Sequence, residues 1–151
     1  MSAPHGMGPP IRRKKPRRKT PEQDFQKDVA DFLTLALPFP DAWFTTIPAG
    51  GGGKVRGAKL KAMGYRAGTP DMLVIYRRPL VGRASDVIVI WLEFKAPNKW
   101  PTKVQKQCRD DLIAAGCKWA LVRTLDDVQR ALERFGVPLR ASVGGALGRV
   151  A

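Results

Sequence analysis

Apolar positions along this chain alternate between helical spacing and the short continuous runs that are typical of buried strands. A helical pattern begins at Thr20-Pro21-Glu22-Gln23, where a threonine cap precedes a proline, and Pro38 ends it. Three more helices are predicted, at about 58–63, from about 102 to 115, and at 125–135. Strands are predicted at 43–47, 72–76, 87–94 and 119–122. The pattern therefore predicts one α/β domain with a central mixed sheet flanked by helices, built on an αβββαβ core.

The same pattern predicts the core and the segments outside it. Residues 1–19 are predicted to be a disordered arm, because proline and glycine punctuate them and seven Lys and Arg occur without one acid. The folded domain is predicted over 20–140, and 141–151 are expected to fray. A mobile basic loop is predicted at 48–54 and a basic hairpin loop at 77–86. The predicted core residues are Phe25, Val29, Phe32, Leu73, Ile75, Ile90, Leu92, Leu112 and Leu121.

Charge narrows the choice of partners. The 151 residues include 27 Lys and Arg against 13 Asp and Glu, which gives a net charge of +14 and a pI near 10.5. Such an excess favours binding to polyanions, with nucleic acid the first candidate. Because no stretch approaches the ~20 apolar residues of a membrane-spanning helix, we expect no membrane partner. The arm itself is compatible with a solubilising tail, a localisation signal or an electrostatic clamp on phosphates.

The scarcity of histidine and cysteine excludes several kinds of catalysis. His5, in the predicted arm, is the one histidine, so Ser-His-Asp and Cys-His mechanisms and histidine-rich zinc sites are not expected. Cys108 and Cys117 have neither a disulfide framework nor zinc spacing, and fit reduced thiols in a cytoplasm. Any catalysis would depend on carboxylates, lysines and a metal bound through oxygen.

Three charged residues stand at the ends of the two clearest strands. Asp71 enters the first strand after Pro70, and Glu93 and Lys95 end the second. An antiparallel pairing of Leu73 with Trp91 and of Ile75 with Val89 places apolar residues opposite one another throughout. In that register Asp71 lies opposite Glu93, with Cβ atoms roughly 5 Å apart, and Lys95 follows on the same face.

Two carboxylates at that separation repel each other unless a positive charge lies between them. Lys95 could supply it in a structural ion cluster, and a divalent cation could supply it in a catalytic site. Mg²⁺ is typically held by one or two carboxylates, water and phosphate oxygens. Such an ion would polarise a phosphodiester and lower the pKa of a water, while Lys95 would stabilise the developing charge.

This constellation resembles the PD-(D/E)xK nuclease superfamily, here as Pro70-Asp71 and Glu93-Phe94-Lys95. The wider sequence is similar to its VRR-type branch in Gly68, two residues before Pro70, and in Thr102-Lys103-Val104-Gln105 after the lysine. Glu22 and Gln26 also fit the first helix of that branch. The sequence departs from the branch after Lys95, where Ala96-Pro97-Asn98 stands in place of the glycine that often follows the lysine. The resemblance covers roughly residues 20–125 and implies a restriction-endonuclease-like domain.

The resemblance also implies a function and its residues. It implies a stand-alone, bacterial or phage-encoded endonuclease that uses Mg²⁺ or Mn²⁺, cuts branched DNA such as four-way junctions, acts in DNA repair and works as a homodimer. A non-catalytic nucleic-acid-binding module and a nuclease that acts on RNA remain as alternatives. The catalytic residues would be Asp71, Glu93, Lys95 and Gln105, the metal ligands Asp71, Glu93 and Glu22, and the DNA contacts Lys54, Arg56 and Lys99. Glu22 could instead only complement its helix terminus, Gln105 could cap its helix or face solvent, and Lys54 and Arg56 could simply face solvent.

Overall fold

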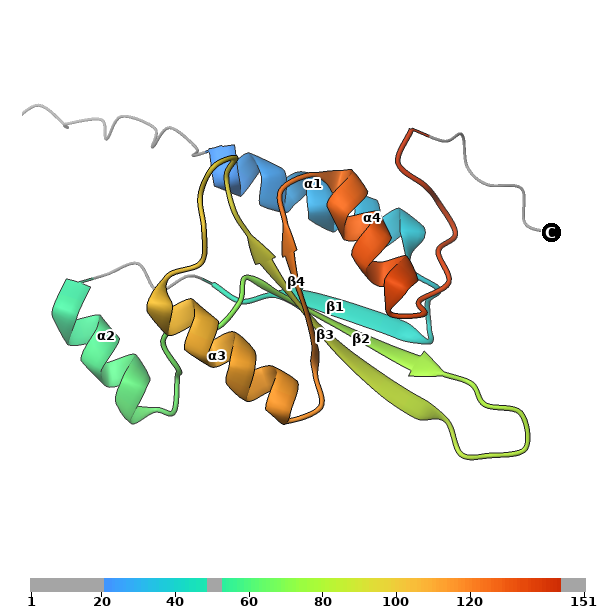
Figure 1. Cartoon of the computed structure of the whole chain (residues 1–151), viewed down its shortest axis with the longest axis horizontal. Coiled ribbons are helices and arrows are strands. Elements are labelled where there is room, and N and C mark those ends of the chain that lie inside the picture. The colour runs from blue at the N-terminus through green and yellow to red at the C-terminus, as the bar shows by residue number, and fades with distance from the viewer. Residues whose placement is uncertain (1–20, 49–52, 145–151) are drawn as a thin grey trace, which may run out of the picture.

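The chain folds around a four-stranded mixed sheet with helices on both faces. The computed structural model describes residues 21–48 and 53–144 (Figure 1). The sheet order is β1-β2-β3-β4, in which β1, β2 and β3 are antiparallel neighbours and β4 runs parallel to β3. In chain order the elements are α1 (Pro21–Ala36), β1 (Ala42–Thr46), α2 (Gly53–Ala62), β2 (Met72–Arg78), β3 (Asp86–Phe94), α3 (Lys103–Ala114), β4 (Lys118–Val122) and α4 (Leu125–Arg134). The predicted α/β class and mixed sheet are confirmed.

The pairing of β2 with β3 follows the register expected from the sequence. Leu73 lies opposite Trp91 and Ile75 opposite Val89. The hairpin is longer than predicted, because both strands continue until Arg78 pairs with Asp86. The parallel partner β4 places Val122 beside Phe94, so the chain segments that follow β3 and β4 start side by side.

The two faces of the sheet are unequally buried. Helices α1 and α4 lie side by side on one face (Figure 1), where Met72, Val74, Ile90 and Leu92 are fully buried. Helix α3 lies on the other face and buries only one of its own residues, Cys108. Four predicted core residues on α3 and on this face of the sheet are therefore only half-buried: Leu73, Ile75, Leu112 and Leu121.

Helix α2 is the main departure from the predicted elements. It begins at Gly53, so Lys54 lies on a helix and not in the mobile loop that was predicted for it, and Arg56 lies on the same helix. None of its residues is buried. Of the predicted loop, residues 49–52 lie outside the described residues.

The ends of the predicted domain are only partly described. The predicted arm 1–19 and the capping residue Thr20 lie outside the described residues, as do residues 145–151. Ala141 and Val143 were expected to fray, but both pack against the core, and the Val143 N–H donates to Gln129 Oε1 at 2.7 Å. Not one helix in the described ranges combines the length and the apolar character needed to cross a bilayer.

Candidate active site

The ends of β2 and β3 bring Asp71 and Glu93 to one place. Glu93 is the next-to-last residue of β3 and, among the described residues, the only buried charged side chain, with 1% of its surface exposed. Asp71 comes immediately before β2, and its Oδ2 accepts a hydrogen bond from the N–H of Phe94 at 2.8 Å. This bond fixes the Asp71 carboxylate against the backbone next to Glu93, as the predicted register requires.

Two side chains donate to the same oxygen of Glu93. Lys95 Nζ lies 2.7 Å from Glu93 Oε1, and Gln105 Nε2 donates to that atom at 2.5 Å. Lys95 is held in place because its N–H donates to the carbonyl of Val122 on β4, and its side chain is 15% exposed. A buried carboxylate that accepts a charge-assisted bond and an amide bond has one fixed orientation.

Gln105 is fixed by the start of α3. Thr102 is the N-cap, and its hydroxyl accepts from the Gln105 N–H, while Gln105 Oε1 accepts from the Thr102 N–H at 2.9 Å. This reciprocal capping box uses the oxygen of the Gln105 amide and leaves its NH₂ group to bind Glu93. The structure thus brings together four of the predicted site residues, Asp71, Glu93, Lys95 and Gln105.

A glycine explains why the segment before Asp71 reaches α3. Gly68 has φ +81°, and a Cβ at this position would lie 2.7 Å from the Val104 carbonyl oxygen and 2.9 Å from the Gln105 nitrogen. Only glycine allows both this conformation and this approach of two backbones. Pro70 is fully buried behind it. The glycine and proline that the sequence places ahead of Asp71 therefore hold that segment against the first turn of α3.

Burial and mutual repulsion oppose ionisation of the two carboxylates. Burial raises the pKa of Asp71, and the charge of Glu22 raises it further, against the lowering effects of the Phe94 N–H and of Lys95. Burial also raises the pKa of Glu93, and the neighbouring Asp71 and Glu22 charges add to it, although Lys95 counteracts them. Carboxylates arranged in this way gain stability from an added positive charge, which is typical of functional sites.

Glu22 lies near this site without joining its hydrogen bonds. It lines a small cavity of about 140 Å³ with Phe25, Lys95 and Arg123, and the Phe25 ring meets Phe94 edge-on at 5.4 Å. Within the described residues no three His, Cys, Asp or Glu side chains form a group close enough to hold a metal ion. Glu22 as a third metal ligand therefore stays a prediction.

The loop after Lys95 has a defined shape despite its departure from the family pattern. Lys99 N–H donates to the carbonyl of Ala96, and Asn98 has φ +61°, so Pro97 and Asn98 are the central residues of a type II turn. The guanidinium of Arg123 donates to the Lys99 carbonyl at 2.7 Å. Sequence reasoning missed Arg123, and the signal that could have found it is the parallel pairing that places residue 123 beside residue 95.

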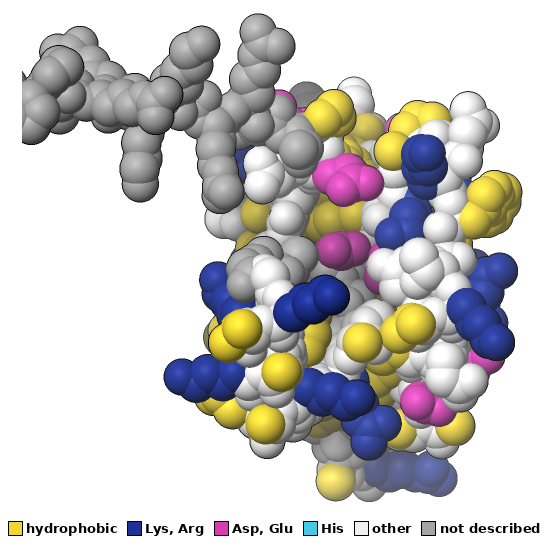
Figure 2. All heavy atoms as spheres, turned by 90° about the vertical axis from the view of Figure 1, so that its left-hand side faces the viewer, with side chains coloured by type: hydrophobic (Ala, Val, Ile, Leu, Met, Phe, Trp, Pro, Cys, Tyr) yellow, Lys and Arg dark blue, Asp and Glu magenta, His cyan; other side chains and the backbone are white. Residues whose placement is uncertain are grey.

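The predicted nucleic-acid contacts are all exposed. Lys99 is exposed on the turn, and Lys54 and Arg56 are exposed on α2. Figure 2 shows the face of the molecule that lies at the left-hand side of Figure 1, where acidic side chains lie in a hollow with Lys and Arg side chains around it. The roles of the three basic residues in binding stay predictions.

Comparison with known proteins identifies the fold. No protein-family profile and no curated protein sequence matches the chain. A solved structure described as "VRR_NUC domain protein" matches with a TM-score of 0.58 and 21% sequence identity, over 79% of this chain and 90% of that chain. The chain therefore has the α/β fold of that VRR_NUC domain protein, with a four-stranded mixed sheet flanked by helices.

Proposed function

We propose that this protein is a metal-dependent endonuclease of the VRR type that hydrolyses phosphodiester bonds in DNA. The observation that carries the proposal is the buried Glu93 carboxylate, which Lys95 and Gln105 hold beside Asp71 at the ends of two paired strands. A buried charge has a high desolvation cost, so a structural role alone gives little reason to place a second carboxylate next to it. The fold likeness to a VRR_NUC domain protein supports the same assignment.

The donor atoms fit a divalent cation. The Phe94 N–H donates to Asp71 Oδ2, and both Lys95 and Gln105 bind Glu93 Oε1, so these bonds engage one oxygen of each carboxylate. Mg²⁺ and Mn²⁺ prefer carboxylate oxygens and complete their shells with water and phosphate oxygens. A bound ion would supply Lewis acidity toward the phosphate and would lower the pKa of the attacking water.

The chain's own residues have separate parts in the proposed reaction. Lys95 places its positive charge beside the carboxylates, where it would stabilise the negative charge that develops on the phosphate. Gln105 is a positioning residue, because its amide holds the Glu93 carboxylate. Water attacks the phosphorus and gives up a proton to solvent, the bond from phosphorus to O3′ breaks, and O3′ takes a proton from solvent. The products are a 5′-phosphate and a 3′-hydroxyl.

Branched DNA and a homodimer belong to the same proposal. The net charge of +14 supports a substrate with a high density of phosphates, as a junction of duplexes has. The fold likeness to a VRR_NUC domain protein supports the type of enzyme, and two copies would place two sites on two strands. A role in DNA repair would follow from cutting such junctions.

Cleavage assays test the proposal. The protein is incubated with four-way, flapped and linear DNA and with RNA duplexes, with Mg²⁺, with Mn²⁺ or with EDTA. Asp71→Asn, Glu93→Gln and Lys95→Ala are each expected to reduce metal-dependent cleavage by at least about 10³-fold while DNA affinity stays within a few-fold. Asp86→Asn is the control, because that carboxylate pairs with Arg78 at the hairpin.

A binding module without catalysis is the second candidate, and one observation favours it. Lys95 and Gln105 already satisfy Glu93 Oε1, so this carboxylate has a partner without any metal. Metal-independent binding with no cleavage of any DNA or RNA would overturn the nuclease proposal and support the module. Cleavage of RNA duplexes in preference to DNA would change the substrate and leave the site unaltered.

A further inference from the structure

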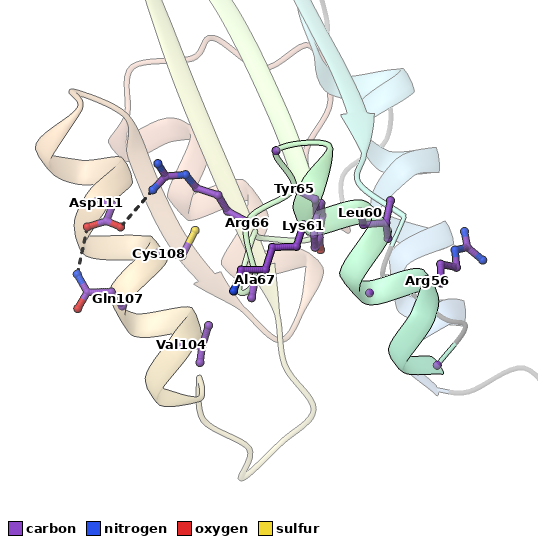
Figure 3. A pocket seen from close by; sticks show the side chains of 13 residues that line it. Arg56, Leu60, Lys61, Tyr65, Arg66, Ala67, Val104, Gln107, Cys108 and Asp111 are labelled. Atoms are coloured by element: carbon purple, nitrogen blue, oxygen red, sulfur yellow. Dashed lines mark hydrogen bonds and ion pairs between the residues drawn. The ribbon is translucent and has the colours of Figure 1, made fainter.

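A groove between α2 and α3 has no part in the site described above. It has a volume of about 700 Å³ and lies between residues 53–67 and residues 104–111 of α3. Figure 3 shows Lys61 and Arg66 extending into the space between the two helices, while Arg56 points away from α3. Arg66 lies 3.9 Å from Asp111, its one carboxylate partner among the described residues. Two cations thus face a groove that is open to solvent.

The groove combines cations with an apolar lining. Leu60, Tyr65 and Val104 contribute apolar surface between the charged groups. The segment 53–67 carries five Lys and Arg and no acid, so the groove attracts a polyanion. Sites for single-stranded nucleic acid have this composition, with cations for the phosphates and apolar or aromatic groups for the base faces.

The chain segments that line the groove lead directly to the candidate active site. The segment that follows α2 lines it as far as Ala67, and the next residue, Gly68, lies against Val104 and Gln105. Asp71 comes three residues after Gly68, and Gln105 binds Glu93. A strand lying in the groove would thus leave it beside the carboxylates.

We propose that this groove binds an unpaired stretch of the nucleic-acid strand next to the scissile phosphate. A cavity of about 700 Å³ has the size of a small-molecule site. A DNA duplex is wider than its own major groove, which is about 12 Å across, so a duplex does not enter this cavity. The inference rests on the proposed nuclease function, because the strand bound in the groove would be the part of the substrate that flanks the scissile phosphate. The enzyme would accordingly prefer DNA with unpaired nucleotides at the cut.

Two lysines on α2 provide a matched test. Lys61 lines the groove, and Lys59, on the same helix and equally charged, does not. Binding of full-length protein to a fluorescent 12-nucleotide oligothymidylate and to a blunt duplex is measured by anisotropy in EDTA at several salt concentrations. Lys61→Ala is expected to weaken oligothymidylate binding about fivefold at 0.1 M salt. It should also lower the salt slope, which is the slope of the logarithm of the binding constant against the logarithm of the salt concentration, by about 0.7, the value of one single-strand phosphate contact. Lys59→Ala is expected to change this binding by less than twofold.

A second variant tests the apolar lining. Tyr65→Leu keeps an apolar side chain and removes the ring, so we expect roughly tenfold weaker oligothymidylate binding with an unchanged salt slope. Duplex binding should change little in both groove variants. Equal losses on the oligothymidylate and the duplex, or equal effects of Lys59→Ala and Lys61→Ala, would overturn the inference. Displacement of the oligothymidylate by polyglutamate of equal charge would also overturn it and indicate an acidic peptide as the occupant.

The two proposals fail separately. Because binding is measured without metal, selective loss in Lys61→Ala would support the groove even if no cleavage is found. Conversely, metal-dependent cleavage with no difference between the two lysine variants would leave the nuclease proposal intact and remove the groove from it.

Discussion

Two helices of this protein begin with the same capping motif, and the two motifs differ in what they contact. Helix α3 uses Thr102 and Gln105, and α4 uses Thr124 and Asp127, each pair exchanging hydrogen bonds between side chain and backbone. Asp127 binds in addition the N–H of Arg123 and the guanidinium of Arg130, both within a few residues of it. The α4 motif is therefore local, whereas the α3 motif extends to Glu93 on the sheet.

The difference lies in one functional group. An ionised carboxylate has only acceptors, so Asp127 can collect donors but cannot bind another carboxylate. The Gln105 amide accepts from Thr102 with its oxygen and donates to Glu93 with its nitrogen. An amide at the third position of a common helix start is enough to connect the helix to a candidate catalytic carboxylate. Variants that disrupt each motif separately distinguish a motif that only caps its helix from one that also holds Glu93.

The largest effect is expected from the glycine that holds the α3 motif against the Asp71 segment. Gly68→Ala forces a Cβ to within 2.7 Å of the Val104 carbonyl at φ +81°, so the free energy of unfolding should fall by about 3 kcal/mol. Gly116→Ala, at φ +92° with open space around it, should cost only about 1 kcal/mol of backbone strain. Urea unfolding followed by circular dichroism measures both. Equal costs would contradict the close approach at Gly68.

The next effect concerns activity and depends on the proposed function. Gln105→Glu keeps the acceptor for Thr102 but removes the donor to Glu93 and adds a third negative charge, so metal-dependent cleavage should fall about 10–100-fold. Asp127→Glu, the control in the α4 motif, should leave the cleavage rate unchanged. If the Gln105 variant cleaves at the normal rate, Gln105 is a cap and not a positioning residue.

Removal of each N-cap hydroxyl should give a smaller effect. Thr102→Ala and Thr124→Ala each lose one side-chain bond to a helix N–H, which should lower stability by about 1 kcal/mol in either variant. Thermal unfolding measures this loss. Only Thr102→Ala should also slow cleavage, because it loosens the side chain that holds Glu93. A loss of cleavage in both variants would indicate that stability alone limits activity.

The smallest effect is the pH dependence of stability, and it should have opposite signs at two aspartates. The pKa of Asp71 is raised, first by burial, so its ionisation destabilises the fold as pH rises from below about 3.8 through the raised value. Burial alone would raise the pKa of Asp127, but hydrogen bonds from Arg123, Arg130 and Thr124 outweigh burial and lower this pKa. The ionised Asp127 therefore stabilises the fold above about pH 3.8, and this stabilisation is lost as the pH falls through the lowered pKa.

These signs are tested with matched amides. At pH 7 Asp71→Asn should unfold at a higher temperature than the parent protein and Asp127→Asn at a lower one, and both differences should shrink toward pH 3. Thermal unfolding at a series of pH values measures this. Addition of Mg²⁺ at pH 7 should raise the unfolding temperature of the parent and of Asp127→Asn, but not of Asp71→Asn.

The sequence predicted what depends on local pattern and on alternation between strands. Alternating apolar residues specify the register of Leu73 with Trp91, because a slip by one residue would reverse every side chain, and this register places Asp71 near Glu93. The start of α2 was not predictable, since the glycines that precede Lys54 have poor helix propensity. Arg123 was missed because its contact depends on β4 lying parallel to β3, a tertiary pairing.

Burial on the two sides of the sheet shows a similar limit. Leu73 and Val74 are both apolar and adjacent, yet Val74 is fully buried and Leu73 is not. The sequence specifies that strand residues alternate in direction, but how completely each side is covered depends on where the helices pack. Gln105 was expected in the site through resemblance alone, and its double hydrogen bonding could not be read from Thr102-Lys103-Val104-Gln105.

Helix α2 buries none of its side chains, and this has a consequence for sequence variation. Substitutions at Lys54, Lys59 or Lys61 remove no packing, so the stability of the fold places little constraint on which residues natural variants carry there. Lysine or arginine that persists at such positions while the rest of α2 drifts would therefore record selection by whatever the helix binds.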